Sequence, residues 1–160
     1  MIVTDLDGTL LNDNDEISDY TLSTFEKCKE KGIYVVIATA RGHSANEIID
    51  LRKPSFSILE DGSLILDSNK NNINNELNAI FIIEKMPAIE LLAKALDINL
   101  SEIVAFGDGY NDIEMIKNCG IGIAMENADE QIKEYAKFIY GNNNEDGVAN
   151  WINENIIVSG

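Results

Sequence analysis

Short apolar runs alternate with segments of helical periodicity along the chain. Four of the runs are continuously apolar, as in strands that are buried on both faces. Between them, apolar side chains recur at three-residue spacing, as in Leu22, Phe25 and Cys28. Strands separated by helices predict an α/β fold with three layers and a mostly parallel central sheet. The four runs lie at residues 1–4, 33–38, 103–106 and 121–124.

Turn and capping residues set further boundaries. Gly32 is expected to end the first helix, and Pro87 is expected to open a later one. A capping box formed by Ser44 and Glu47 predicts a helix through Leu51. The other predicted elements are a hairpin of strands 56–59 and 63–66, strands at 80–83 and 138–140, helices at 113–117, 130–137 and 148–153, and an asparagine-rich loop at 67–78.

Composition narrows the class of protein. With 160 residues, of which 45% are hydrophobic, the chain is expected to form one globular domain over 1–160. The net charge of −16 disfavours nucleic-acid binding, because neutralising phosphates needs Lys and Arg. Cys28 and Cys119 lie in apolar surroundings and are expected to be free, buried thiols. No leader-like or membrane-spanning run follows Met1, so a cytoplasmic protein without membrane contact is expected.

Unusual polar residues gather where the apolar runs end. Because parallel strands present their carboxyl ends at one edge of a sheet, these residues are expected to meet there. They offer carboxylates for Mg²⁺ and a hydroxyl and an ammonium for phosphoryl oxygens. Asp5 and Asp7, two apart in an extended segment, project to the same side, so one could attack phosphorus while the other protonates the leaving oxygen. The segments are 5–9, 39–41, Lys85 and 107–112.

Several motifs together resemble the haloacid-dehalogenase (HAD) superfamily, and within it the Cof-type phosphatases of subclass IIB. They are DLDGTLL at 5–11, ATAR at 38–41, Lys85 and GDGYNDIEM at 107–115, with supporting runs at 121–128 and 144–148. The resemblance implies a Rossmann-like core that hydrolyses a phosphomonoester with Mg²⁺ through an aspartyl-phosphate. A small phosphorylated metabolite such as a sugar phosphate is the implied substrate.

The resemblance also implies residue roles. Asp5 would be the nucleophile and a metal ligand, and Asp7 the general acid and base, with its backbone carbonyl on the metal. Asp108 would be the second metal carboxylate, and Asp112 would orient a metal-bound water or Lys85. Lys85 would neutralise the aspartyl-phosphate. The implied phosphate contacts are Thr39, Ala40, Lys85 and Asn111, and Arg41 is a possible substrate contact.

The chain departs from the Cof-type pattern mainly by a deletion. Only 43 residues separate Arg41 from Lys85, and the predicted helix, hairpin and asparagine-rich loop occupy them. A cap domain would be inserted at 67–78, so we expect little or no cap. A cap excludes water and supplies substrate contacts. A homo-oligomer, a dimer or a tetramer, is therefore expected to cover the open site; a large substrate or weak, unselective activity are the other possibilities.

Plainer interpretations stay open for single residues. Asp112 also suits a helix N-terminus, and Thr39 could cap a turn. Arg41 could bind a substrate anion or pair with an acidic neighbour. The expected surface residues are His43, the only histidine, and the loop acids Asp13, Asp15 and Glu16.

Two other functions also stay open. A receiver-like signalling domain would accept a phosphoryl group on an aspartate without turnover. A catalytically idle subunit of an HAD-fold oligomer would keep the site without its activity.

Overall fold

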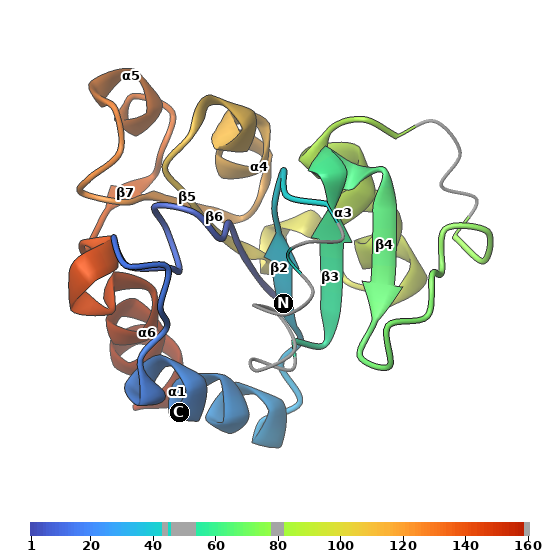
Figure 1. Ribbon diagram of the computed structural model, residues 1–160, viewed down its shortest axis with the longest axis horizontal. Coiled ribbons are helices and arrows are strands. Elements are labelled where there is room, and N and C mark those ends of the chain that lie inside the picture. Colours follow the sequence, from blue (N-terminus) through green and yellow to red (C-terminus); the bar gives the residue numbers. More distant parts are fainter. Residues whose placement is uncertain (43–44, 46–53, 78–81, 159–160) are drawn as a thin grey trace.

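A seven-stranded sheet forms the middle layer of the part of the chain that the structure describes (Figure 1). This computed structural model describes residues 1–42, 45, 54–77 and 82–158. The strand order is β4-β3-β2-β1-β5-β6-β7, and every neighbouring pair is parallel except β3 and β4. The strands are β1 Ile2–Thr4, β2 Val35–Ala38, β3 Phe56–Leu59, β4 Leu64–Asp67, β5 Val104–Gly107, β6 Ile121–Ala124 and β7 Phe138–Ile139.

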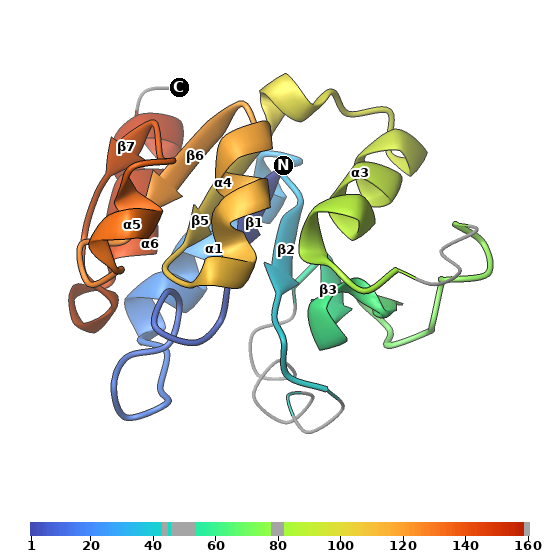
Figure 2. The same ribbon diagram turned by 90° about the horizontal axis from the view of Figure 1, so that it is seen from above.

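Helices cover both faces of the sheet (Figures 1 and 2). Alternate side chains of the central strands enter opposite cores, so Ile2 and Phe106 pack on one side while Val3 and Ala105 pack on the other. The first core includes α1 and α6, and the second includes α3 and α4. The helices are α1 Asp19–Glu30, α3 Lys85–Ala95, α4 Ile113–Asn118, α5 Glu130–Lys133 and α6 Gly147–Ile152. The predicted three-layer α/β fold is confirmed.

Local signals explain where α1 begins and ends. The side chain of Ser18 accepts a hydrogen bond from the backbone N–H of Thr21 at 3.0 Å, which caps the first turn. At the other end, Gly32 adopts a φ of +72°, the left-handed conformation that commonly follows a helix. The predicted end of this helix is thereby confirmed.

Some predicted boundaries were wrong. The helix expected to open at Pro87 begins at Lys85, so the proline lies within its first turn, where a missing N–H costs nothing. The helix predicted at 130–137 ends at Lys133, because the chain must turn there to reach β7. Residues 82 and 83 belong to no strand. The predicted capping box, His43 and the first half of the 80–83 strand lie outside the described residues.

The two cysteines are free and buried, as predicted. Burial raises the pKa of the Cys28 thiol to about 11 and that of the Cys119 thiol to about 12. Every helix among the described residues is too short or too polar to cross a bilayer.

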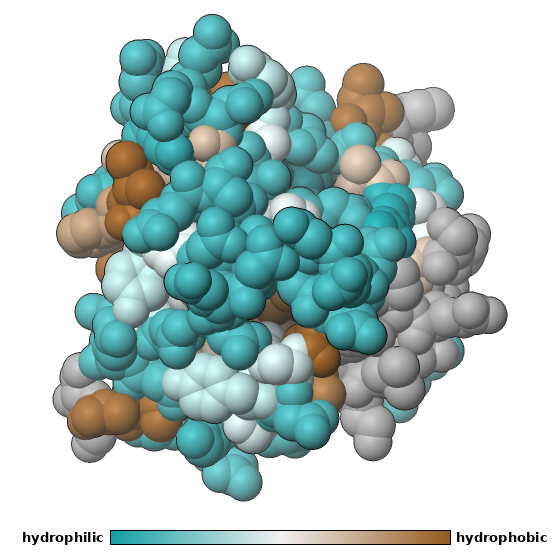
Figure 3. All heavy atoms as spheres, turned by 60° about the vertical axis from the view of Figure 1, so that its left-hand side comes forward, coloured by the Kyte–Doolittle hydropathy of each residue, from teal (hydrophilic) through white to brown (hydrophobic). Residues whose placement is uncertain are grey.

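The face that carries α5, α6 and β7 is largely hydrophilic (Figure 3). Apolar residues appear on it as separate spots, and the exposed side chains of the short edge strand are Phe138 and Ile139. This face therefore presents no broad apolar surface, and the predicted homo-oligomer stays a prediction.

Candidate active site

The carboxyl ends of the three central strands bring the predicted site together. Strand β1 lies between β2 and β5, with Thr4 opposite both Ile37 and Phe106. Asp5 therefore emerges between Thr39, which follows β2, and Asp108, which follows β5. The backbone N–H of Asp5 donates to the Phe106 carbonyl at 3.0 Å and fixes the first residue beyond the strand.

Four charged side chains form an inner cluster at this edge: Asp5, Lys85, Asp108 and Asp112. The Lys85 ammonium donates to Asp5 Oδ1 at 2.6 Å and to Asp112 Oδ1 at 2.7 Å, and all three side chains are buried. Asp112 Oδ2 accepts the backbone N–H groups of Asp108 at 3.1 Å and Gly109 at 3.0 Å. Asp112 thus ties the lysine to the loop that carries Asp108.

The turn after Asp7 holds Asp108 in place. The buried Thr9 hydroxyl donates to Asp108 Oδ1 at 2.6 Å. Gly8 adopts a φ of +71°, and a Cβ there would lie 2.9 Å from Asp108 Cγ and closer still to Oδ2. Only glycine fits both this conformation and this approach.

The charge of the inner cluster suits a cation. Ligand oxygens of Asp5, Asp108 and Asp112 all lie within 4.8 Å of one another, while the cluster holds one ammonium. Burial, and then the charge of Asp112, raises the pKa of Asp5 despite Lys85, and burial likewise raises the pKa of Asp108. Burial alone would lower the pKa of Lys85, but the two carboxylates raise it, so the lysine stays charged.

Two carboxylate oxygens of the inner cluster remain open. Both oxygens of Asp112 are occupied by hydrogen bonds. Asp5 Oδ2 and Asp108 Oδ2 receive no hydrogen bond from the described residues. Asp5 and Asp108 are therefore the pair that could hold a hard cation, which prefers carboxylate oxygens.

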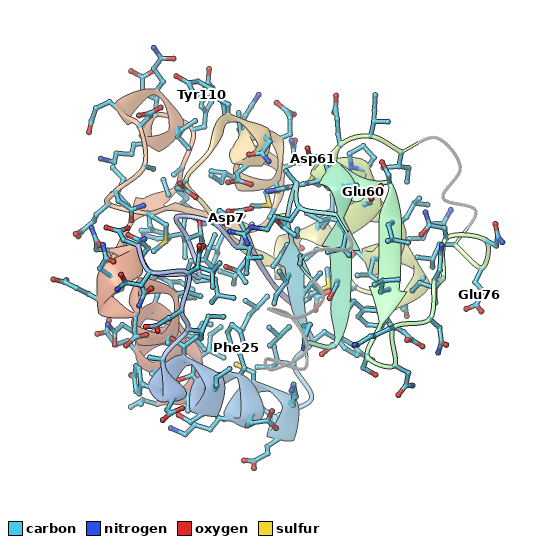
Figure 4. The ribbon with its side chains drawn as sticks, in the orientation of Figure 1. Asp7, Phe25, Glu60, Asp61, Glu76 and Tyr110 are labelled. Carbon is cyan, nitrogen blue, oxygen red and sulfur yellow. The ribbon has the colours of Figure 1, made fainter. Side chains whose placement is uncertain are left out.

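Asp7 points away from the inner cluster. Its Oδ2 accepts from Arg41 Nε at 2.9 Å and its Oδ1 from Arg41 Nη2, a two-point pair. The same Nη2 donates to Asp15 Oδ1 at 3.0 Å, so one guanidinium holds two carboxylates. Asp7 is exposed, and Figure 4 shows it on the loop that follows β1. We call these three side chains, Asp7, Asp15 and Arg41, the Arg41 cluster.

The remaining predicted phosphate contacts lie around this edge. The buried Thr39 hydroxyl accepts the Arg41 backbone N–H at 3.1 Å and donates to no acceptor among the described residues. Ala40 is exposed beside it. Asn111 is exposed and donates through Nδ2 to Asp61 Oδ1 at 3.0 Å.

Comparison with known proteins identifies the family. A model of the haloacid dehalogenase-like hydrolases matches residues 2–80 and 76–152, nearly the whole chain. The chain belongs to this family. The 5-amino-6-(5-phospho-D-ribitylamino)uracil phosphatase YcsE of Bacillus subtilis is 28% identical to it over an alignment of 231 residues that covers 93% of the chain and 92% of the relative. Four other curated relatives named as phosphatases match over 22% to 28% of their own length.

Solved structures of HAD phosphatases share the fold. BT1666 from Bacteroides thetaiotaomicron has a TM-score of 0.85 at 19% identity, with 96% of this chain and 93% of that chain covered. The HAD subclass IIB sugar phosphatase BT4131 has a TM-score of 0.78 at 18% identity, with 96% and 97% covered. The predicted Cof-type HAD phosphatase class is confirmed.

The sequence predicted the inner cluster of this HAD phosphatase but not the residues around it that hold it in place. Asp5, Lys85, Asp108 and Asp112 meet as expected. Asp7 does not join their carboxylates, and the expected role of its backbone carbonyl stays a prediction, as do the phosphate contacts of Thr39, Ala40 and Asn111.

The sequence left the roles of three residues around the site open or unassigned: Arg41 and Asp15 of the Arg41 cluster, and Thr9, which holds Asp108. Arg41 pairs with acidic neighbours, one of its two open interpretations. Asp15, interpreted as a solvated surface acid, is one of those neighbours. Thr9 had no assigned role, although its place in the DLDGT motif was the available signal.

Proposed function

We propose that this HAD phosphatase hydrolyses phosphomonoesters with Mg²⁺ and forms an aspartyl-phosphate on Asp5. One observation carries the proposal: Asp5 is buried beside Lys85 and Asp108 and keeps one carboxylate oxygen open. A merely structural ion pair gives no reason for the carboxylates of Asp108 and Asp112 to lie within 4.8 Å of Asp5, because like charges close together in a buried site are costly.

The inner cluster fits the cation that this chemistry needs. Its donors are all oxygens, and three carboxylates face a single ammonium. Asp5 and Asp108 would hold Mg²⁺, together with the backbone carbonyl of Asp7. When bound, Mg²⁺ would neutralise negative charge on the phosphoryl oxygens.

The side chains of this chain account for the two displacements. A carboxylate oxygen of Asp5 attacks phosphorus, and the bond from phosphorus to the ester oxygen breaks. Asp7 gives that oxygen its proton, then takes a proton from the water that attacks the aspartyl-phosphate, which releases phosphate and restores Asp5. Lys85 offsets charge at Asp5, and the free hydroxyl hydrogen of Thr39 is donated to a phosphoryl oxygen. For this role one oxygen of Asp7 would turn toward the ester while the other keeps its contact with Arg41.

The proposed substrate is a small phosphorylated metabolite such as a sugar phosphate. The names of relatives support this class, since YcsE is named for a phosphorylated ribitylamino compound and BT4131 is named as a sugar phosphatase. We further propose a reducing compartment such as the cytoplasm, which the two free thiols favour.

We also propose that the chain lacks a cap domain and assembles as a dimer or tetramer that covers the site. Two findings support the missing cap. The alignment with YcsE extends over 231 residues although this chain has 160, and the family model matches in two segments that meet at residues 76–80. A gel-filtration mass equal to that of the monomer would contradict the oligomer.

The test is hydrolysis of p-nitrophenyl phosphate by the parent protein and by Asp5→Asn and Asp7→Asn, with and without Mg²⁺. We expect turnover only with Mg²⁺, and its loss in both variants by about a hundredfold or more. Glu76→Gln is the matched control, because Glu76 is exposed on a distant loop (Figure 4) and its change removes one charge as well.

The same experiment separates the other two functions. A receiver-like domain would be phosphorylated once, without sustained release of phosphate. An idle subunit would release no phosphate from any of a broad panel of phosphomonoesters. Rates that are unaffected by Asp5→Asn would contradict the proposed nucleophile.

A further inference from the structure

A cavity of about 270 Å³ opens beside the inner cluster. It lies between three segments at the carboxyl edge of the sheet: the turn after β3, the start of α3 and the loop after β5. Lys85 and Met86 are the buried members of its lining. The other lining residues are Asp61, Ile83, Glu84, Tyr110, Asn111 and Glu114. A group bound in this cavity would be next to a phosphoryl group held at Asp5.

The lining of the cavity combines apolar surface with acidic groups. Tyr110 is 59% exposed and Ile83 is 75% exposed, so both present apolar surface that the described residues leave uncovered. Asp61 and Glu84 contribute carboxylates that form no ion pair with the described residues, whereas Glu114 pairs with Lys117 at 3.2 Å. Figure 4 shows Asp61 and Tyr110 arriving from separate segments of the chain.

The cations near this cavity are already engaged. The ammonium of Lys85, the one basic residue among the described lining residues, lies between Asp5 and Asp112. Arg41, on the neighbouring loop, holds Asp7 and Asp15. A carboxylate or second phosphate on the leaving group would therefore meet acidic groups with no free basic partner among the described residues.

We propose that this cavity binds the leaving group of the substrate and selects a neutral or cationic one. The inference rests on the proposed function and adds the charge class of the substrate to it. The hydroxyl or amino groups of such a leaving group would donate to Asp61 and Glu84, and its carbon skeleton would pack on Tyr110 and Ile83. Phosphate esters with a second negative charge are disfavoured.

Three small esters of similar size test the charge class. They are 2-hydroxyethyl phosphate, phosphoethanolamine and phosphoglycolate, whose leaving groups are neutral, cationic and anionic. We expect kcat/KM with Mg²⁺ for each of the first two to exceed that for phosphoglycolate by about tenfold, as for a unit charge beside two carboxylates near a protein surface.

Isosteric variants test the assignment to this cavity. In the double variant Asp61→Asn, Glu84→Gln both changes remove charge and keep size and a hydrogen-bond acceptor. Asparagine also tolerates the φ of 51° at position 61. We expect the excess over phosphoglycolate to fall to about threefold or less. Glu76→Gln, which removes one negative charge on a distant loop, should keep the parent ratio. Thermal melting of each variant verifies folding.

Binding to Asp5→Asn, measured by calorimetry with the three esters, distinguishes the two proposals. Hydrolysis of all three at similar kcat/KM, or a ratio that the double variant leaves unchanged, would overturn the leaving-group site while the phosphatase function stands. Binding that ranks the esters by charge in Asp5→Asn, without hydrolysis by the parent, would support the site and refute the function. Absence of both binding and hydrolysis would overturn both.

Discussion

The inner cluster and the Arg41 cluster both consist of charged side chains, and Asp5 of the first is only two residues from Asp7 of the second, yet the two clusters differ in almost every physical respect. Lys85 and Asp112 are buried and fixed by hydrogen bonds to one another and to the backbone. Asp7 and Arg41 are paired at the surface and shared with Asp15. Under the proposed function this difference would separate two tasks: the buried set would hold the phosphoryl group in a fixed geometry, and Asp7 of the exposed set would turn to protonate the leaving group.

The largest expected difference between the two regions is the loss in free energy of unfolding when one cation is removed from each. Lys85→Met leaves two buried carboxylates without their counter-ion and should lower the free energy of unfolding by about 3–5 kcal/mol. Arg41→Met breaks an exposed pair and should cost about 1 kcal/mol or less. Urea unfolding in the presence of a chelator measures both. Equal losses would remove the distinction between the regions.

A comparison of two glycines with the same backbone conformation tests how the carboxylate of Asp108 is held in place. Gly8 and Gly32 have φ values of +71° and +72°, but a Cβ at Gly32 would meet nothing within 4 Å. Gly32→Ala should cost about 1–2 kcal/mol for the left-handed backbone alone. Gly8→Ala should cost roughly 1–3 kcal/mol more and weaken Mg²⁺ binding, because it displaces Asp108. Similar Mg²⁺ affinities in the two variants would show that Gly8 does not position that carboxylate.

Esters whose leaving groups differ in basicity test whether the Arg41 cluster positions the general acid Asp7. If Arg41 positions Asp7 as the acid, Arg41→Met should lower kcat for an alkyl phosphate by about tenfold, a fraction of what general acid catalysis contributes. With 2,4-dinitrophenyl phosphate, whose leaving group needs no proton, the loss should be about twofold or less. Asp15→Asn should show the same pattern more weakly. A uniform loss for both esters would indicate a merely structural role.

The effect that is smallest per step is the change in Mg²⁺ affinity for each unit of pH. Burial raises the pKa of Asp5 to about 8 in the cation-free protein. Such a shift makes the folded protein bind the proton more tightly than the unfolded chain, so it destabilises the fold progressively as pH rises from about 4 to about 8. Mg²⁺ must displace that proton, so its affinity should rise several-fold per pH unit across this window. A thermal shift at fixed Mg²⁺ that shrinks with rising pH would contradict this.

The two regions also differ in what the sequence could predict. Asp5, Lys85, Asp108 and Asp112 each stand next to the end of an apolar run or the start of a helix, so topology alone brings them together. The Arg41 partners depend on how residues 12–17 fold back, with Asp15 in a left-handed conformation at φ 60°. A tertiary contact between two loops leaves no periodic trace in the sequence.

Helix ends illustrate the same limit. Ser18 and Gly32 mark the bounds of α1 through local hydrogen bonding and backbone preference, and the end at Gly32 was predicted correctly. The early end of α5 at Lys133 has no such local signal, because it is imposed by the pairing of β7 with β6. Pairing between distant segments overrides helical propensity.

The most direct test of the central claim is a crystal of the protein soaked in Mn²⁺ and measured at the manganese absorption edge. Manganese stands in for Mg²⁺ and is located by its anomalous scattering. We expect one peak, bonded to an oxygen of Asp5 and an oxygen of Asp108 at roughly 2.0–2.3 Å, with Asp112 outside the coordination shell. No peak between these two carboxylates, or a peak held elsewhere, would contradict the assignment of the inner cluster as the site of phosphoryl transfer.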